Sequence, residues 1–120
     1  MGETPLRVHV VEDDEGVSDS LGIILGNLGH DVVSHRTAES LFAGAPPIAT
    51  DAVIVDLSLP GIPGAQAVRW LLQLAGPPHI VVITGQSQSV IDHQLRGLGP
   101  TQLMRKPLDF DTISMALPAA

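Results

Sequence analysis

Acidic side chains crowd the segment RVHVVEDDEG, where an apolar run at residues 7–11 is followed by Glu12, Asp13, Asp14 and Glu15. Neighbouring carboxylates disfavour one another's charged form and raise one another's pKa unless a cation lies between them. Mg²⁺ is such a cation, because it binds through one or two carboxylates, waters and a substrate phosphate. The segment therefore predicts a divalent-cation site at the end of a strand.

Three more polar side chains follow apolar runs further along the chain. Asp56 ends DAVIVD, Thr84 ends HIVVIT, and Lys106, the single lysine of the sequence, follows TQLMR. A carboxylate can act as a nucleophile and accept a phosphoryl group. Phosphoryl transfer also needs positive charge beside the phosphoryl oxygens, which a metal and a lysine supply. These residue types together indicate phosphoryl transfer onto an aspartate.

Strand-like and helix-like segments alternate along the chain and must position these side chains. Runs rich in β-branched residues are typical of buried parallel strands, and they cover residues 6–11, 31–35, 51–56, 79–84 and 101–105. Apolar residues at helical spacing predict helices, and these cover residues 15–28, 37–44, 64–75, 86–98 and 109–117. This alternation predicts an α/β fold with a mostly parallel sheet.

The polar side chains fall at the carboxyl ends of the predicted strands. Ligands of doubly wound sheets bind outside those ends, so we expect the acidic pair, Asp56, Thr84 and Lys106 to meet at one edge. Asp14 and Glu15 are expected to face solvent and to favour the start of the first helix through its dipole.

The composition describes one acidic domain. A chain of 120 residues fits a single domain, which we expect to span residues 1–120, with any effector domain outside this chain. The net charge of −7 argues against direct binding of nucleic acid or of an anionic membrane. There is no cysteine for a disulfide framework or a thiolate zinc site. No run approaches the roughly 20 apolar residues of a membrane helix, and we expect a cytoplasmic domain.

Four motifs resemble the receiver domain of bacterial two-component response regulators, over nearly the full chain. They are VVEDD, VIVDLSLPGIPG, VVITG and MRKP, and they place Asp13, Asp56, Thr84 and Lys106 at successive separations of 43, 28 and 22 residues. Each motif alone is weak, whereas the four in order at these separations are specific. The resemblance implies a doubly wound (βα)5 fold, with a five-stranded parallel sheet in the flavodoxin-like, CheY-like strand order 2-1-3-4-5.

The resemblance assigns a metal site and a phosphoacceptor. Asp56 would accept the phosphoryl group. Glu12 and Asp13 would be the acidic pair at Mg²⁺ or Mn²⁺, with Asp13 the more direct ligand. Asp56 and the backbone carbonyl of Ser58 would complete the protein's share of the coordination.

The resemblance also assigns a switch. Thr84 would be the switch hydroxyl and Lys106 the ammonium that pairs with the phosphoryl group, with the Lys106–Pro107 peptide bond cis. Gly64 matches the glycine that begins the third helix in this family.

Three residues depart from the usual pattern of the family. Glu12 stands where many receivers have aspartate, and its longer arm would reach the metal through water. Leu103 takes the place of the switch aromatic, three residues before the lysine, so the usual readout is in doubt. Arg105 and the short last helix put in doubt the usual dimer face, which the fourth helix, fifth strand and fifth helix form.

The leading hypothesis is a phosphoacceptor receiver domain rather than an enzyme for external substrates. It would take a phosphoryl group from a histidine kinase or a histidine phosphotransfer protein onto Asp56 with Mg²⁺, and would assist its own phosphorylation and dephosphorylation. The surface around the fourth helix and fifth strand would then change, and a homodimer through that surface is a further expectation.

Three alternatives compete with this hypothesis. A receiver-like binding module acting largely without phosphorylation would suit Leu103, although it need not retain the acidic cluster. A small phosphohydrolase with Asp56 as nucleophile would need a general acid near Ser58, where the sequence has none. A dinucleotide enzyme is disfavoured because the first turn is acidic rather than glycine-rich.

Overall fold

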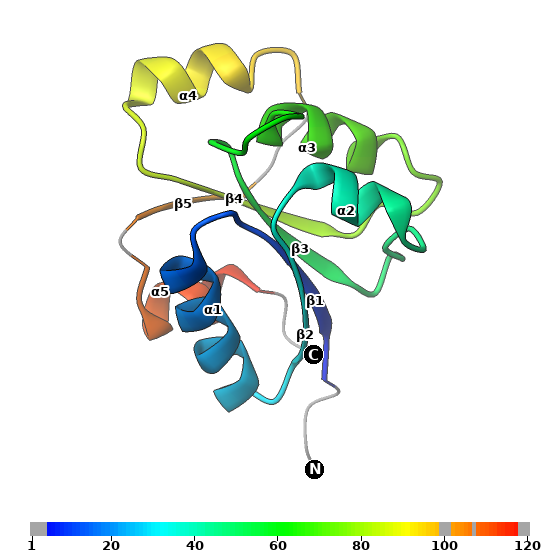
Figure 1. The fold of residues 1–120 in the computed structure, drawn as a ribbon, viewed down its shortest axis with the longest axis vertical. Coiled ribbons are helices and arrows are strands. Elements are labelled where there is room, and N and C mark those ends of the chain that lie inside the picture. Colours follow the sequence, from blue (N-terminus) through cyan, green and yellow to red (C-terminus); the bar gives the residue numbers. More distant parts are fainter. Residues whose placement is uncertain (1–4, 99–101, 107, 118–120) are drawn as a thin grey trace.

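Strands and helices alternate along the chain as the sequence predicts (Figure 1). The computed structural model describes residues 5–98, 102–106 and 108–117. The strands are β1 (Arg7–Val11), β2 (Asp31–His35), β3 (Ala52–Asp56), β4 (His79–Thr84) and β5 (Gln102–Arg105). The helices are α1 (Glu15–Asn27), α2 (Ala38–Ala43), α3 (Gly64–Leu72), α4 (Gln88–Gln94) and α5 (Phe110–Ala116).

The five strands form one parallel sheet in the order β2-β1-β3-β4-β5. This confirms the predicted fold class and strand order. β1 pairs with β3 so that Val11 lies opposite Val55, and β4 pairs with β5 so that Thr84 lies opposite Arg105. The carboxyl ends of β1, β3, β4 and β5 are therefore neighbours, although they are far apart in the sequence.

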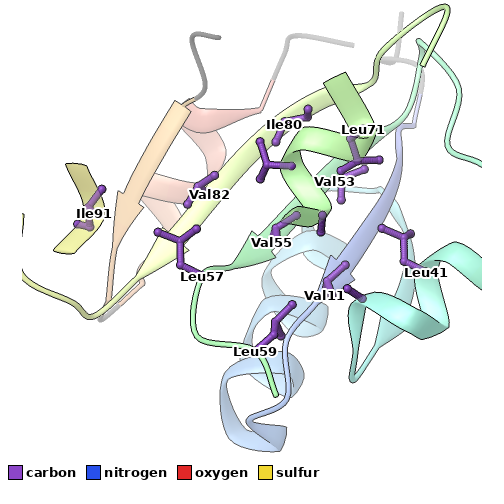
Figure 2. Close-up of a cluster of buried hydrophobic side chains, with 13 residues drawn as sticks. Val11, Leu41, Val53, Val55, Leu57, Leu59, Leu71, Ile80, Val82 and Ile91 are labelled. Carbon is purple, nitrogen blue, oxygen red and sulfur yellow. The ribbon is translucent and has the colours of Figure 1, made fainter. Parts of the chain in front are cut away.

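Two hydrophobic layers hold the helices against the sheet. On one face, residues of α2, α3 and α4 pack on β1, β3 and β4, with Leu41, Leu71 and Ile91 among the buried side chains (Figure 2). On the other face lie α1 and α5 (Figure 1), and Leu21 and Leu25 of α1 and Ile113 of α5 pack on the sheet. Burial of each large aliphatic side chain contributes roughly 1.5–3 kcal/mol.

The edge strands differ from the prediction that all five strands are buried. β3 is buried along its whole length, but β2 has no fully buried residue, and β5 buries only Met104. β2 and β5 are the outer strands of the sheet, so each has a neighbouring strand on one side only. Their β-branched and apolar residues indicated strands correctly but did not report burial.

Helix ends also differ from the predicted ranges, most of all in α4, which was expected over residues 86–98 and covers Gln88–Gln94. Ser87 is in extended backbone conformation and precedes the first turn. Beyond the other end, Gly97 has a φ of +80°, a left-handed conformation that α-helix cannot contain. Among the described residues, no helix is long and apolar enough to cross a membrane.

Gly64 lets α3 begin directly against the segment that follows β3. A Cβ at Gly64 would lie 2.1 Å from the backbone oxygen of Asp56 and 2.7 Å from the Cα of Leu57. Both atoms belong to the backbone, so neither can move aside by a rotamer change. Glycine therefore fixes the approach of α3 to the residue at the end of β3.

Gly64→Ala is expected to lower the free energy of unfolding by about 1–3 kcal/mol, because overpacking displaces the backbone. Gly22→Ala is the matched control: it lies inside α1, nothing lies within 4 Å of its added Cβ, and it should stabilise the protein by up to about 1 kcal/mol. Urea unfolding measures both variants. A Gly64→Ala protein as stable as wild type would contradict the close approach.

Candidate functional site

The carboxyl edge of the sheet brings the predicted site residues together. Glu12 and Asp13 follow β1, Asp56 and Thr84 are the last residues of β3 and β4, and Lys106 follows β5. Glu12, Asp56 and Thr84 are 1%, 2% and 0% exposed. Polar side chains this buried need partners, because burial of an unpaired charge is costly.

Three carboxylates form one cluster. Glu12, Asp13 and Asp56 each offer one oxygen, and these oxygens all lie within 4.8 Å of one another. Glu12 and Asp56 are buried, whereas Asp13 is partly exposed. The cluster therefore has one side open to solvent, and its donor set is made of oxygens, which suits a hard divalent cation.

Lys106 bridges the two buried carboxylates. Its Nζ donates to Oε1 of Glu12 at 2.7 Å and to Oδ2 of Asp56 at 3.1 Å. The other oxygen of Asp56, Oδ1, accepts the backbone N–H of Ser58 at 3.0 Å. Among the described residues, Oε2 of Glu12 is buried with no hydrogen-bond partner, so Glu12 has one free oxygen at the cluster.

The remaining two acids of the run serve the first helix, as predicted. Asp14 is the N-cap of α1, and its Oδ1 accepts the backbone N–H of Val17 at 3.1 Å. Glu15 lies in the first turn and is exposed. An acidic N-cap and first turn satisfy free N–H groups and complement the helix dipole.

Hydrogen bonds determine the charges of Asp56 and Lys106. Burial alone would raise the pKa of Asp56, but the neighbouring Glu12 carboxyl and the hydrogen bonds from the Ser58 N–H and Lys106 hold this pKa below its ordinary value. Burial would likewise lower the pKa of Lys106, yet its hydrogen bonds to Glu12 and Asp56 raise it. Asp56 is therefore an anion and Lys106 a cation at neutral pH.

Glu12 is the carboxyl group of the cluster whose pKa is raised. Burial, followed by contact with Asp56, raises its pKa from 4.5 to about 7, against the opposing effect of Lys106. Glu12 and Asp56 share the ammonium of Lys106, and Asp56 also accepts the backbone N–H of Ser58. The second charge is therefore disfavoured on Glu12.

Thr84 is buried, and its hydroxyl contacts the loop that follows β4. Its Oγ1 accepts the backbone N–H of Gln86 at 3.0 Å, and its carbonyl oxygen accepts the N–H of Lys106 at 2.9 Å. Thr84 is thus linked to Lys106 through the backbone. Pro107, and with it the predicted cis peptide bond, lies outside the described residues, and no contact tests the predicted role of the Ser58 carbonyl.

The residues around β5 hold the part of the site that sequence reasoning missed. Leu103 is partly buried and packs against the core layer of α2, α3 and α4. Arg105 donates from Nη1 to the backbone oxygen of Gln86 at 2.9 Å and from Nη2 to Oε1 of Gln88. The sequence around Arg105 contains no pattern that predicts these contacts, because the two partners lie 19 and 17 residues earlier in the chain.

Comparison with known protein families identifies the chain. The sequence profile of the response regulator receiver domain matches residues 8–117. The chain belongs to this family. The receiver domain is also similar to the transcriptional regulatory protein FixJ of Azorhizobium caulinodans, with 28% identity over 115 residues, covering 96% of this chain and 54% of that protein.

A second relative gives the same result. FixJ of Rhizobium meliloti is 30% identical over 117 residues, covering 98% of this chain and 57% of that protein. The receiver domain thus spans little more than half the length of the curated relatives that it matches.

Solved structures agree with the fold. The structure named FixJ-N has a TM-score of 0.80 and 29% identity, covering 94% of this chain and 90% of that one. The receiver domain of the sensor histidine kinase PA1611 of Pseudomonas aeruginosa has a TM-score of 0.82 at 19% identity, covering 93% of each chain, and holds a magnesium ion in its active-site cleft. At that identity the second likeness concerns the fold alone.

The raised pKa of Glu12 predicts a pH dependence of stability. Between 4.5 and about 7 the folded, metal-free protein keeps a proton on Glu12 that the unfolded chain has released. The contribution of this group to the free energy of unfolding therefore falls as the pH rises through this window. Glu12→Gln, compared with wild type in EDTA, should gain relative stability from about pH 5 to about pH 8.

Comparing the two proteins at each pH cancels the effect of His35, whose pKa burial lowers and whose contribution therefore increases with pH. Glu15→Gln, at an exposed position, is the control and should show no such trend. Chemical unfolding at several pH values gives the free energies, and a constant difference between Glu12→Gln and wild type would show that Glu12 titrates normally.

Proposed function

We propose that this receiver domain accepts a phosphoryl group on Asp56 with the help of a divalent cation. The observation that carries the proposal is the buried Asp56 carboxylate, which Lys106 contacts at 3.1 Å beside the Glu12–Asp13 pair. An anionic aspartate held by a lysine and adjoining two further carboxylates has a nucleophile, a cation for the incoming group and oxygen ligands for a metal.

The residues of the cluster fit Mg²⁺ or Mn²⁺. Glu12 has a buried oxygen without a hydrogen-bond partner among the described residues, and Asp13 and Asp56 bring their oxygens within 4.8 Å of it. We propose these three residues as the metal site, with the carbonyl of Ser58 as a fourth donor. When bound, the metal would neutralise charge beside the phosphoryl oxygens. The PA1611 receiver, which shares the fold, holds a magnesium ion in its active-site cleft.

The proposed transfer proceeds from a phosphohistidine of a partner protein. An Asp56 oxygen forms a bond to phosphorus while the phosphorus–nitrogen bond breaks, and the electron pair of that bond leaves with the imidazole. The products are an acyl phosphate on Asp56 and a free histidine on the partner. The Lys106 ammonium has three donors, of which two contact Glu12 and Asp56, so the third can donate to a phosphoryl oxygen.

The phosphorylated state would act on the rest of the domain through Thr84. Its hydroxyl is buried at the end of β4, the strand next to β3, and can donate to a phosphoryl oxygen on Asp56. Thr84 is joined to α4 by a short loop and lies opposite Arg105 on β5. We infer that α4, β5 and α5 form the surface whose partners, a second copy included, respond to phosphorylation.

One observation favours a second candidate function, a binding module largely independent of phosphorylation. Leu103 lacks an aromatic ring and already packs against the core layer. Its movement on phosphorylation would therefore be smaller than that of a large side chain that alternates between two positions. This candidate and the first share a fold and differ in chemistry at Asp56.

Mg²⁺ is expected to stabilise the domain, because a ligand that binds only the folded state adds about 2.7 kcal/mol at 100 times its Kd. The melting temperature of wild type should rise by several degrees on addition of MgCl₂. Asp13→Asn should lose most of this rise, whereas Asp19→Asn, an exposed aspartate on α1, should keep it. If MgCl₂ raised the melting temperature of Asp13→Asn as much as that of wild type, Asp13 would not be a metal ligand.

Phosphorylation is tested with acetyl phosphate, a small donor that needs no cognate kinase. Intact-protein mass spectrometry should show one added phosphoryl group on wild type and on Asp19→Asn with Mg²⁺, and none with EDTA or on Asp56→Asn. A gain on Asp56→Asn equal to wild type would refute Asp56 as the acceptor. No gain on any protein would favour the binding module.

A further inference from the structure

We propose that Arg105 is a positioning residue that restrains the Thr84 switch in the unphosphorylated domain. This inference rests on the proposed function and adds a residue to it. It starts from Leu103, which occupies the place of the switch aromatic and packs against the core. The fifth strand contacts the loop after β4 through a different side chain.

Gln86 is held through both of its backbone polar groups, which lie on either side of its Cα. Its backbone N–H donates to Oγ1 of Thr84 at 3.0 Å, and its carbonyl oxygen accepts Nη1 of Arg105 at 2.9 Å. The Thr84 hydroxyl and the guanidinium are therefore connected through a single residue. A movement of one changes the hydrogen bonding of the other.

The guanidinium also braces the start of α4. Its Nη2 donates to Oε1 of Gln88, and Nε2 of Gln88 donates to Oδ1 of Asp92 at 2.7 Å, one helical turn later. Arginine has a rigid fork of donors, so two acceptors on the loop and the helix are fixed relative to β5. All of these side chains are exposed, and each bond alone is weak.

Thr84 cannot approach a phosphoryl group on Asp56 without affecting this arrangement. Its oxygen accepts from Gln86 in the present structure, so either that bond breaks or the loop follows the threonine. The first change costs the Gln86–Thr84 hydrogen bond, and Arg105 opposes the second, since it holds the carbonyl of the same residue. The Oε1 of Gln86 is buried with no partner among the described residues, so the held arrangement also carries a desolvation cost that a rearrangement can relieve.

Loss of the Arg105 contacts and loss of its charge are expected to change the affinity for a phosphoryl mimic in opposite directions. We call the contacts of Arg105 with Gln86 and Gln88 the brace. Because the brace forms in the unphosphorylated arrangement, its removal shifts the population toward the arrangement that binds phosphoryl oxygens. Arg105→Ala should therefore bind beryllofluoride, a tetrahedral phosphoryl mimic, about fivefold more tightly in the presence of Mg²⁺. Loss of a positive charge beside an anion site would by itself weaken this binding.

Arg105→Lys separates the fork from the charge, since lysine keeps the charge and loses the two-pronged geometry. It should bind beryllofluoride more tightly than wild type, as Arg105→Ala does. Arg69→Ala, which removes an exposed arginine from α3, is the matched control and should bind as wild type does. Titration followed by NMR gives the affinities.

A second measurement works without any ligand. Amide hydrogen exchange at Gln86 in the metal-free domain should be several-fold faster in Arg105→Ala than in wild type and Arg69→Ala. If wild type fails to bind beryllofluoride, the proposed function fails, and the exchange rate still tests the brace. Unchanged exchange at Gln86, or unchanged or weaker beryllofluoride binding by Arg105→Ala when wild type binds, overturns the proposal for Arg105.

Discussion

The ammonium of Lys106 among buried carboxylates is the interaction on which the rest of the site depends. Glu12 and Asp56 are almost fully buried, and two acids so placed would repel each other without a cation. Lys106 contacts both, at 2.7 and 3.1 Å, yet one positive charge does not balance three neighbouring carboxylates. Burial and the neighbouring Asp56 therefore raise the pKa of Glu12 to about 7. The divalent cation proposed for this site would remove the need for a proton on Glu12.

This arrangement requires a parallel sheet with its crossovers on both faces. Glu12 and Lys106 are 94 residues apart in the chain but lie at the ends of strands in the same sheet. The two core layers hold the strand register that aligns these ends, and Gly64 allows α3 to begin against the backbone of Asp56. The scaffold is common to the receiver family, to which the profile match assigns the chain. The chemistry proposed here lies entirely in side chains at one of its edges.

Coupling from the site to the surface is where this receiver domain differs most from the pattern that its motifs predict. Leu103, which the resemblance places at the position of the switch aromatic, packs against the core and has no polar group that could reach the loop after β4. Arg105 makes that contact instead, through the backbone of Gln86. Because Gln86 also bonds to Thr84, β5 and Thr84 both contact the backbone of this one residue. In this receiver domain β5 therefore connects to Thr84 through Gln86, without an aromatic side chain.

The sequence by itself determined the alternation of strands and helices and the polar residues at strand ends, because both follow from local periodicity and chain order. It also separated Asp14 and Glu15 from the acidic pair, since helix capping is a local effect. Only the tertiary structure decided that β2 and β5 are largely exposed, that Glu12 rather than Asp56 has a raised pKa, and that Arg105 reaches Gln86. Each of these depends on which strands are outermost and on distances between segments far apart in the chain, and no local pattern encodes those distances.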